Sequence, residues 1–155
     1  MSSQHELIER FLRAKRIALV GVSRNPADFS RTLWKELRSR SYDMVPVNTH
    51  QQDIDGIRCY RSLNAISPPV DAVLIMVGKT ETANVITDCI LAGVPLVWVY
   101  GVMGEKDIAP EVLSLANAAG LNLIAGQCPY MFLNNTAWFH GLHRFGWKLL
   151  GKFPR

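Results

Sequence analysis

A short polar segment, GVSRNP at residues 21–26, has the residue types that bind a phosphate group. It follows an apolar run and precedes a helical pattern that Ser30 is expected to open, so free backbone N–H groups and the positive end of a helix dipole would favour an anion there. The alternative is a tight turn with solvated polar residues. The segment predicts a phosphate-binding loop formed by Gly21, Val22, Ser23, Arg24, Asn25 and Pro26, with Arg31 nearby.

Several motifs of common nucleotide sites are missing around this loop. The dinucleotide fingerprint G-x-G-x-x-G has three glycines and an acid at the end of the second strand that holds the ribose hydroxyls. Here the loop has one glycine, and the second strand ends in VPVNTH without an acid. The GKT at residues 78–80 lacks the upstream glycine of a P-loop. These differences count against a NAD site and against a P-loop.

Three further loops are expected to face the same site. The loop after the second strand contains Val47, Asn48, Thr49 and His50. The next contains Val77, Gly78, Lys79 and Thr80, where Lys79 offers a cation and Thr80 a helix N-cap. The last contains Val99, Tyr100 and Gly101.

The elements that must position these loops alternate between strands and helices. Apolar runs at residues 17–21, 44–47, 72–77, 96–99 and 121–125 indicate strands, and residues 57–60 form a weaker edge candidate. The runs are continuous rather than alternating, as in a parallel sheet covered on both faces.

This pattern predicts an α/β fold with a single Rossmann-like, doubly wound domain. We expect a mainly parallel sheet of five or six strands, in an order near 3-2-1-4-5, with helices on both faces. In such sheets ligands bind beyond the carboxyl ends of the strands, where the strand order reverses.

Composition excludes several classes of protein. No apolar run approaches the roughly 20 residues of a membrane span. Three widely spaced cysteines indicate a reducing compartment, so we expect a cytoplasmic protein, with Cys128 a buried hydrophobe rather than a redox-active thiol. All 13 acidic residues lie within residues 1–111, and this part of the chain is electrically neutral. The net charge of +4 comes from residues 144–155. A basic charge confined to this segment does not indicate a nucleic-acid partner for the domain.

The chain divides into a Rossmann-like domain at residues 1–130 and a basic, aromatic, helical extension at residues 131–155. Trp138, Leu142, Phe145 and Leu149 recur at helical spacing, and we expect this stripe to pack on the same domain. The alternatives are a homodimer contact through the extension and an interfacial helix at a membrane surface. No metal site is expected from the histidines at 140 and 143, because no acid lies in this part of the chain. No catalytic constellation is seen, which favours a protein that is not an enzyme.

Four segments carry a family resemblance: RIALVGVSRNP, the stretch at residues 42–77, GVPLVWVYGVM and AGLNLIAGQCP. They contain G-x-S-x-N-P, P-V-N and G-x-x-x-Y-x-S-L in that order. About residues 12–130 resemble the small stand-alone CoA-binding proteins, whose fold is similar to the N-terminal CoA-binding domain of the succinyl-CoA synthetase alpha subunit.

The resemblance implies that CoA or an acyl-CoA is the ligand. By matched motif, residues 22–26 would contact the diphosphate and residues 47–50 the adenosine end. Residues 77–80 would line the other side, and residues 99–101 would approach the pantetheine arm. Two departures are Thr49, where many relatives have proline, and Lys79, where relatives have an arginine or similar cation.

The resemblance does not extend to the synthetase reaction, because no segment matches the domain that carries the phosphohistidine. Non-catalytic binding of CoA is therefore the leading hypothesis. The alternatives are an NAD(P)-binding redox sensor or small oxidoreductase, and an interaction module that uses the C-terminal tail.

Overall fold

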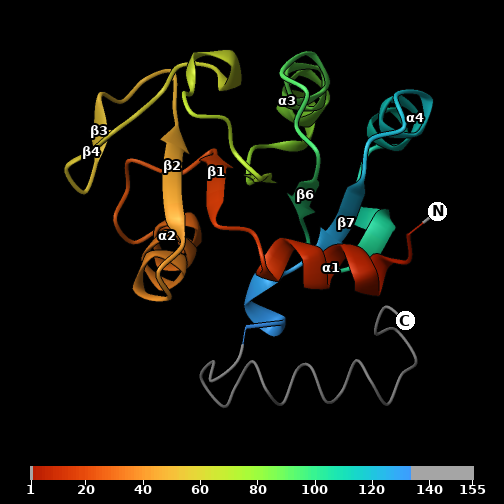
Figure 1. Cartoon of the computed structure of the whole chain (residues 1–155), viewed down its shortest axis with the longest axis horizontal. Coiled ribbons are helices and arrows are strands. Elements are labelled where there is room, and N and C mark those ends of the chain that lie inside the picture. Colours follow the sequence, from red (N-terminus) through yellow and green to blue (C-terminus); the bar gives the residue numbers. More distant parts are fainter. Residues whose placement is uncertain (1, 134–155) are drawn as a thin grey trace.

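The centre of the molecule is a five-stranded parallel sheet (Figure 1). The computed structural model describes residues 2–133. The strands lie in the spatial order β2-β1-β5-β6-β7. Their bounds are β1 Arg16–Val20, β2 Asp43–Val47, β5 Ala72–Ile75, β6 Val97–Tyr100 and β7 Leu123–Gln127.

Helices cover both faces of this sheet (Figure 1). The first face packs against α1 (Gln4–Leu12) and α2 (Phe29–Ser39), and the second against α3 (Lys79–Leu91) and α4 (Pro110–Ala118). The predicted Rossmann-like α/β class is confirmed. Short 3-10 helices interrupt the connections at η1 Leu63–Ala65, η2 Gly104–Asp107 and η3 Pro129–Met131.

Successive side chains of β1 point to opposite faces of the sheet, and both faces are covered, so every residue in the strand's interior must be apolar. Ile17 and Leu19 pack in the cluster that contains α1 and α2, whereas Ala18 and Val20 pack in the cluster that contains α3. All four side chains are buried. Because successive residues of a strand point to opposite faces, a sheet covered on both sides has no polar face.

The strand order differs from the expected 3-2-1-4-5. Counted along the chain, the five strands of the sheet have the order 2-1-3-4-5. The weaker edge candidate at residues 57–60 does not join the sheet as a strand: β3 (Asp53–Ile54) and β4 (Ile57–Arg58) pair with each other in a separate antiparallel hairpin. Only Tyr60 reaches the main sheet, through a bridge to Val47.

A local turn explains why residues 57–60 do not join the main sheet as a strand. Asp55 and Gly56 both have positive φ angles, 51° and 77°, and an Asp-Gly pair is typical of tight two-residue hairpins. The turn folds the segment back on itself, so the hydrogen bonds of β4 are made to β3 rather than to β2.

The expected C-terminal helix, its homodimer contact and the two histidines at 140 and 143 lie outside the described residues. Within residues 2–133, none of the helices has the length and apolar character needed to cross a membrane.

Phe11 tests the packing of α1 on the sheet. Its ring is 1% exposed and lies 4.9 Å from the Trp98 ring, centroid to centroid, in an edge-on contact. We expect Phe11→Ala to lower the free energy of unfolding by about 3–5 kcal/mol, because it leaves a cavity in the core. Urea denaturation measures the change. The exposed Arg10 is the control on the same helix, and Arg10→Ala should stay within about 0.5 kcal/mol.

Candidate functional site

A cleft of about 470 Å³ opens beyond the carboxyl ends of β1, β2 and β5. This is where the strand order reverses, because the chain continues from β1 to β2 on one side and β5 lies on the other. The strand ends form its floor, the segment after Tyr60 forms one wall and α3 forms the opposite wall. Its lining includes Gly21, Val47, Asn48, Thr49, His50, Arg61, Ser62, Leu63, Val77, Glu81, Asn84, Val85 and Asp88.

Gly21 allows the first loop to pass close to the end of β5. Its φ is +95°, and a Cβ placed there would lie 2.7 Å from the backbone carbonyl of Met76 and 2.8 Å from a methyl group of Val77. A side chain at this position would therefore push the loop away from β5. The single glycine is required by the packing of the two strand ends.

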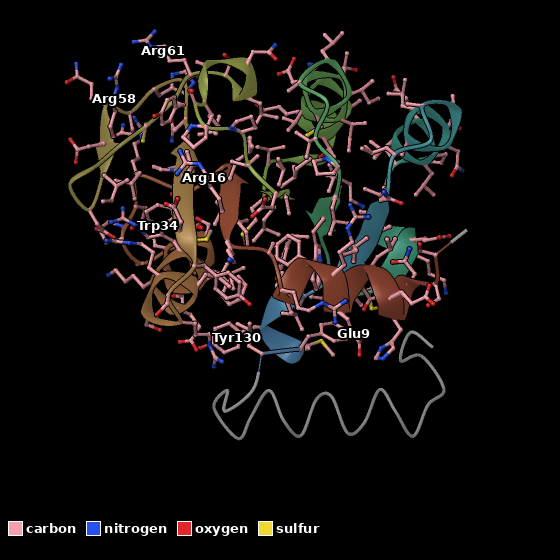
Figure 2. The ribbon with its side chains drawn as sticks, viewed as in Figure 1. Glu9, Arg16, Trp34, Arg58, Arg61 and Tyr130 are labelled. Carbon is pink, nitrogen blue, oxygen red and sulfur yellow. The ribbon has the colours of Figure 1, made fainter. Side chains whose placement is uncertain are left out.

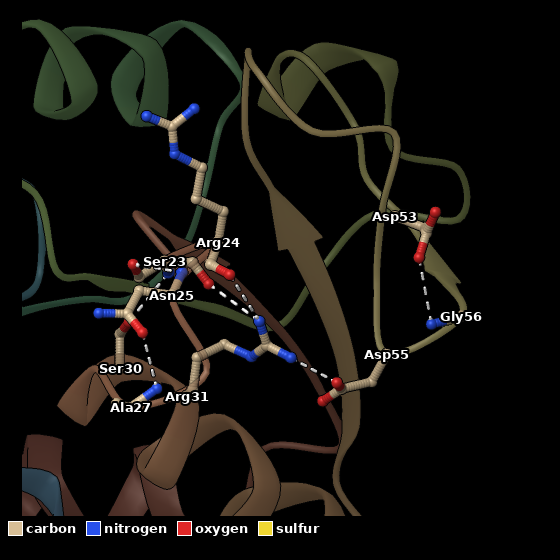
Figure 3. A network of polar contacts seen from close by, with 9 residues as sticks. All are labelled: Ser23, Arg24, Asn25, Ala27, Ser30, Arg31, Asp53, Asp55 and Gly56. Carbon is tan, nitrogen blue, oxygen red and sulfur yellow. Dashed lines mark hydrogen bonds and ion pairs between the residues drawn. The ribbon is translucent and has the colours of Figure 1, made fainter.

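The loop after β1 is ordered by its own side chains (Figure 3). The Ser23 amide donates to Ser30 Oγ at 2.9 Å, the Asn25 amide to Ser23 Oγ at 3.1 Å, and the Ala27 amide to Asn25 Oδ1 at 3.0 Å. These bonds use backbone donors that the sequence suggested were free for an anion. The side chain of Arg24 is exposed and extends away from this network (Figure 3).

Asn48 joins this loop to the loop after β2. Its Nδ2 donates to the Val22 carbonyl at 3.0 Å, and its Oδ1 accepts from the amides of His50 at 2.7 Å and Gln51 at 3.1 Å. One amide side chain thus fixes both loops at the floor of the cleft.

Arg31 acts inside the protein rather than at the cleft. It is 6% exposed, donates to the Ser23 carbonyl at 3.2 Å and to the Arg24 carbonyl at 3.5 Å, and forms an ion pair with Asp55 (Figure 3). The contacts that Arg31 makes are all within the protein. The predicted contact between Arg31 and a ligand stays a prediction.

The two helices that begin at this edge are capped differently from the expectation. Asp28, not Ser30, is the N-cap of α2, and its carboxylate accepts from the Ser30 amide at 2.8 Å. Gly78, not Thr80, is the N-cap of α3, and it makes no side-chain cap. Thr80 lies in the first turn because α3 already begins at Lys79. The N-terminus of α2 is thus already occupied by a carboxylate.

A smaller pocket of about 200 Å³ lies on the other side of Val77. Its walls are largely apolar, and Lys79 and Asp107 stand among them. Hydrogen bonds from the amides of Val102 and Met103 hold the pKa of Asp107 below its usual value, and the charge of Lys79 acts in the same direction. The loop after β6 is therefore fixed by an ionised carboxylate.

The predicted residues fall into four groups, three of which line cavities. The large cleft brings together Gly21, Val47, Asn48, Thr49, His50 and Val77. The small pocket brings together Val77, Lys79, Val99, Tyr100 and Gly101. Arg24 lines a recess shared with Asn48 and His50. Seven predicted residues line none of these: Val22, Ser23, Asn25, Pro26, Arg31, Gly78 and Thr80.

Sequence reasoning missed two walls of the cleft. Glu81, Asn84, Val85 and Asp88 line it from α3. Their spacing of i, i+3, i+4 and i+7 places them on one helix face, which could have been recognised. The other wall, residues 61–63, includes the serine and leucine of Y-x-S-L, a motif that the sequence indicated only as part of a family resemblance.

The cysteines do not supply a reactive thiol at this site. Cys59, Cys89 and Cys128 are all buried and unpaired by disulfides. Burial raises the pKa of the Cys128 thiol, and it raises the pKa of Cys89 to about 12. Buried thiols with raised pKa values are poor nucleophiles, in agreement with the interpretation of Cys128 as a small hydrophobe. Among residues 2–133, no cluster of three or more histidine, cysteine and carboxylate side chains is arranged to hold a metal ion.

Comparison with known proteins identifies the class to which this fold and cleft belong. The family model described as CoA binding domain matches residues 15–134. The chain belongs to this family of CoA-binding domains.

Some relatives are much longer than this chain, and others have about the same length. The chain is 26% identical over 129 residues to the alpha subunit of acetate–CoA ligase (ADP-forming) II from Pyrococcus furiosus, covering 79% of this chain but only 28% of the ligase subunit. It is 29% identical over 127 residues to the uncharacterized protein YneT from Bacillus subtilis, covering 81% of this chain and 90% of YneT. A hypothetical protein from Pyrococcus horikoshii has a similar structure, with a TM-score of 0.72, 28% identity and coverage of 83% and 87% of the two chains.

Gly21 provides a test of the close approach at the floor of the cleft. Gly120 is the matched control, because it also has a positive φ but a Cβ there would meet no atom within 4 Å. We expect Gly120→Ala to lower the free energy of unfolding by about 1–2 kcal/mol through backbone strain. Gly21→Ala should cost about 1–3 kcal/mol more, because the added methyl overlaps the Met76 backbone directly after β5. Equal losses in urea denaturation would contradict the packing role.

Proposed function

We propose that this domain binds CoA or an acyl-CoA in the cleft between the loop after β1 and helix α3. The observation that carries the proposal is the coincidence of a CoA-binding family match with a cleft at the point of strand reversal. The cleft volume, about 470 Å³, is suitable for a nucleotide portion, since ligand pockets commonly measure about 300–1,000 Å³.

The ligand is proposed to cross three regions. The diphosphate lies against residues 22–26, with the exposed Arg24 guanidinium beside it. The adenosine end occupies the large cleft near residues 47–50, over an apolar floor that includes Val20 and Leu63. The pantetheine arm passes Val77 into the small pocket, where Lys79 and residues 99–101 lie.

The adenosine end of CoA carries a 3′-phosphate, which NAD lacks. The exposed side chains of His50 and Arg61 both line the cleft, and we propose that they lie near this phosphate. Glu81 and Asp88 line the opposite wall, on α3, so the phosphate is favoured on the basic side. This charge distribution supports CoA over NAD⁺ and NADH, which carry no phosphate on the adenosine ribose beyond the diphosphate.

We propose that the domain binds its ligand without catalysing a reaction. The buried thiols of residues 59, 89 and 128 support this, since none has the exposure of a nucleophile. The chain spans 28% of the length of the Pyrococcus furiosus ligase subunit, so that protein's activity is not assigned to this one.

Calorimetry with CoA, acetyl-CoA, NAD⁺ and NADH tests the proposed ligand. CoA or acetyl-CoA should bind at least about tenfold more tightly than either nicotinamide cofactor, a difference of about 1.4 kcal/mol, because only the CoA compounds supply a 3′-phosphate. Tighter binding of NADH would support the redox alternative instead. Absence of binding by all four compounds would overturn the proposal.

Arg61 tests the position of the 3′-phosphate. Arg61→Ala should weaken CoA binding by about tenfold, because a charge-assisted hydrogen bond is lost, and should leave dephospho-CoA binding nearly unchanged. Arg58 is a matched control: it is also exposed on the same side of the molecule (Figure 2), but it lies over the Tyr60 ring and does not line the cleft. If Arg61→Ala weakens both ligands equally, the 3′-phosphate lies elsewhere.

A further inference from the structure

An ion pair between the buried Arg31 of α2 and the partly exposed Asp55 connects the α2 end of the loop after β1 to the β3–β4 hairpin. The Arg31 side chain is 8% exposed and the Asp55 side chain 29% exposed. Arg31 lies in the first turn of α2, and Asp55 lies at the hairpin turn, 24 residues further along the chain. Neither residue lines the cleft or the small pocket.

The Arg31 guanidinium determines which way the loop backbone faces. One of its terminal nitrogens donates to the carbonyls of Ser23 and Arg24, and the other pairs with Asp55 (Figure 3). Both carbonyls are therefore directed toward Arg31. The Arg24 side chain extends in the opposite direction (Figure 3).

Arg31 can hold this position only while its charge is compensated. A buried guanidinium without an acidic partner is strongly unfavourable, and neutral carbonyls compensate it only in part. Asp55 supplies the carboxylate, and the positive φ of 51° at this residue is part of the turn that presents it.

The hairpin is also connected to a wall of the cleft. The Cys59 amide donates to the Gln52 carbonyl at 2.8 Å, and the Asn48 amide donates to the Tyr60 carbonyl at 3.0 Å. Residues 61–63, which follow directly, line the cleft. The ion pair thus connects the proposed diphosphate loop with the wall that carries Arg61.

We propose that Asp55 is a positioning residue of the binding site: by neutralising Arg31 it keeps the Ser23 and Arg24 carbonyls turned away from the ligand and the Arg24 side chain turned outward. The expected effect of Asp55 on CoA binding rests on the proposed function. The expected effect of Asp55 on the conformation of the loop does not depend on any ligand.

Asp55→Asn is the central variant, because it removes the charge and keeps the shape. In the ligand-free protein, we expect hydrogen exchange of the amides at residues 23–31 to become at least about tenfold faster, since the loop loses its anchor. CoA affinity should fall by about tenfold, because charge-assisted hydrogen bonds no longer order the loop. Asp55→Glu, which keeps the charge, should recover most of both losses.

Asp53 is the matched control on the same hairpin. Its Oδ1 accepts from the Gly56 amide at 3.3 Å, and it is not a partner of Arg31 (Figure 3). Asp53→Asn should leave both the exchange of residues 23–31 and the CoA affinity within about twofold of the parent protein.

A double variant separates positioning from general stability. Replacing the pair by Arg31→Met and Asp55→Asn removes both charges, so thermal stability should recover relative to Asp55→Asn alone. Methionine cannot donate to the two loop carbonyls, so CoA affinity should stay low. Recovery of affinity together with stability would show that the pair is only structural and would overturn the proposal.

The outcomes also separate this inference from the proposed function. If the parent protein does not bind CoA, the proposed function fails, while faster exchange in Asp55→Asn would still support the role in ordering the loop. If the parent binds CoA and Asp55→Asn changes neither exchange nor affinity, the positioning role is wrong. Faster exchange with unchanged affinity would equally contradict positioning.

Discussion

The parallel pairing of β1 with β2 on one side and β5 on the other is the constraint on which the site depends. Because all three strands end at the same edge, the chain leaving β1 emerges between the ends of its two neighbours. Gly21 meets this constraint by letting the loop pass within contact of the Met76 backbone. The cleft is the space that remains above these three strand ends once helices cover both faces of the sheet.

Within that space, the loop is fixed before any ligand arrives. Side chains of the loop and of α2 hold its amides, and Asn48 and Arg31 hold its carbonyls. An ordered loop loses less conformational freedom on binding, which favours affinity. This order has an electrostatic cost, because Arg31 is a buried charge and depends on a carboxylate from the distant hairpin.

Local sequence patterns predicted the elements well and their long-range partners poorly. The apolar runs located all five strands of the sheet to within about two residues, since burial on both faces requires unbroken apolar character. The pairing of Tyr60 with β2, which brings residues 61–63 to the cleft, depends on a hairpin whose two strands pair with each other and not with the main sheet. The role of Arg31 was missed for the same reason, because its acidic partner lies on that hairpin.

The acid that a dinucleotide site carries after its second strand is replaced here by Asn48, and the structure gives a reason. Asn48 donates to the Val22 carbonyl and accepts from the amides of His50 and Gln51 at the same time. An ionised aspartate could accept both amides but could not donate, and it would repel the Val22 carbonyl. The single glycine and the missing acid therefore do not indicate a degraded NAD loop. They belong to a loop that is held by an amide side chain and whose cleft has neutral and basic groups where NAD would need a carboxylate.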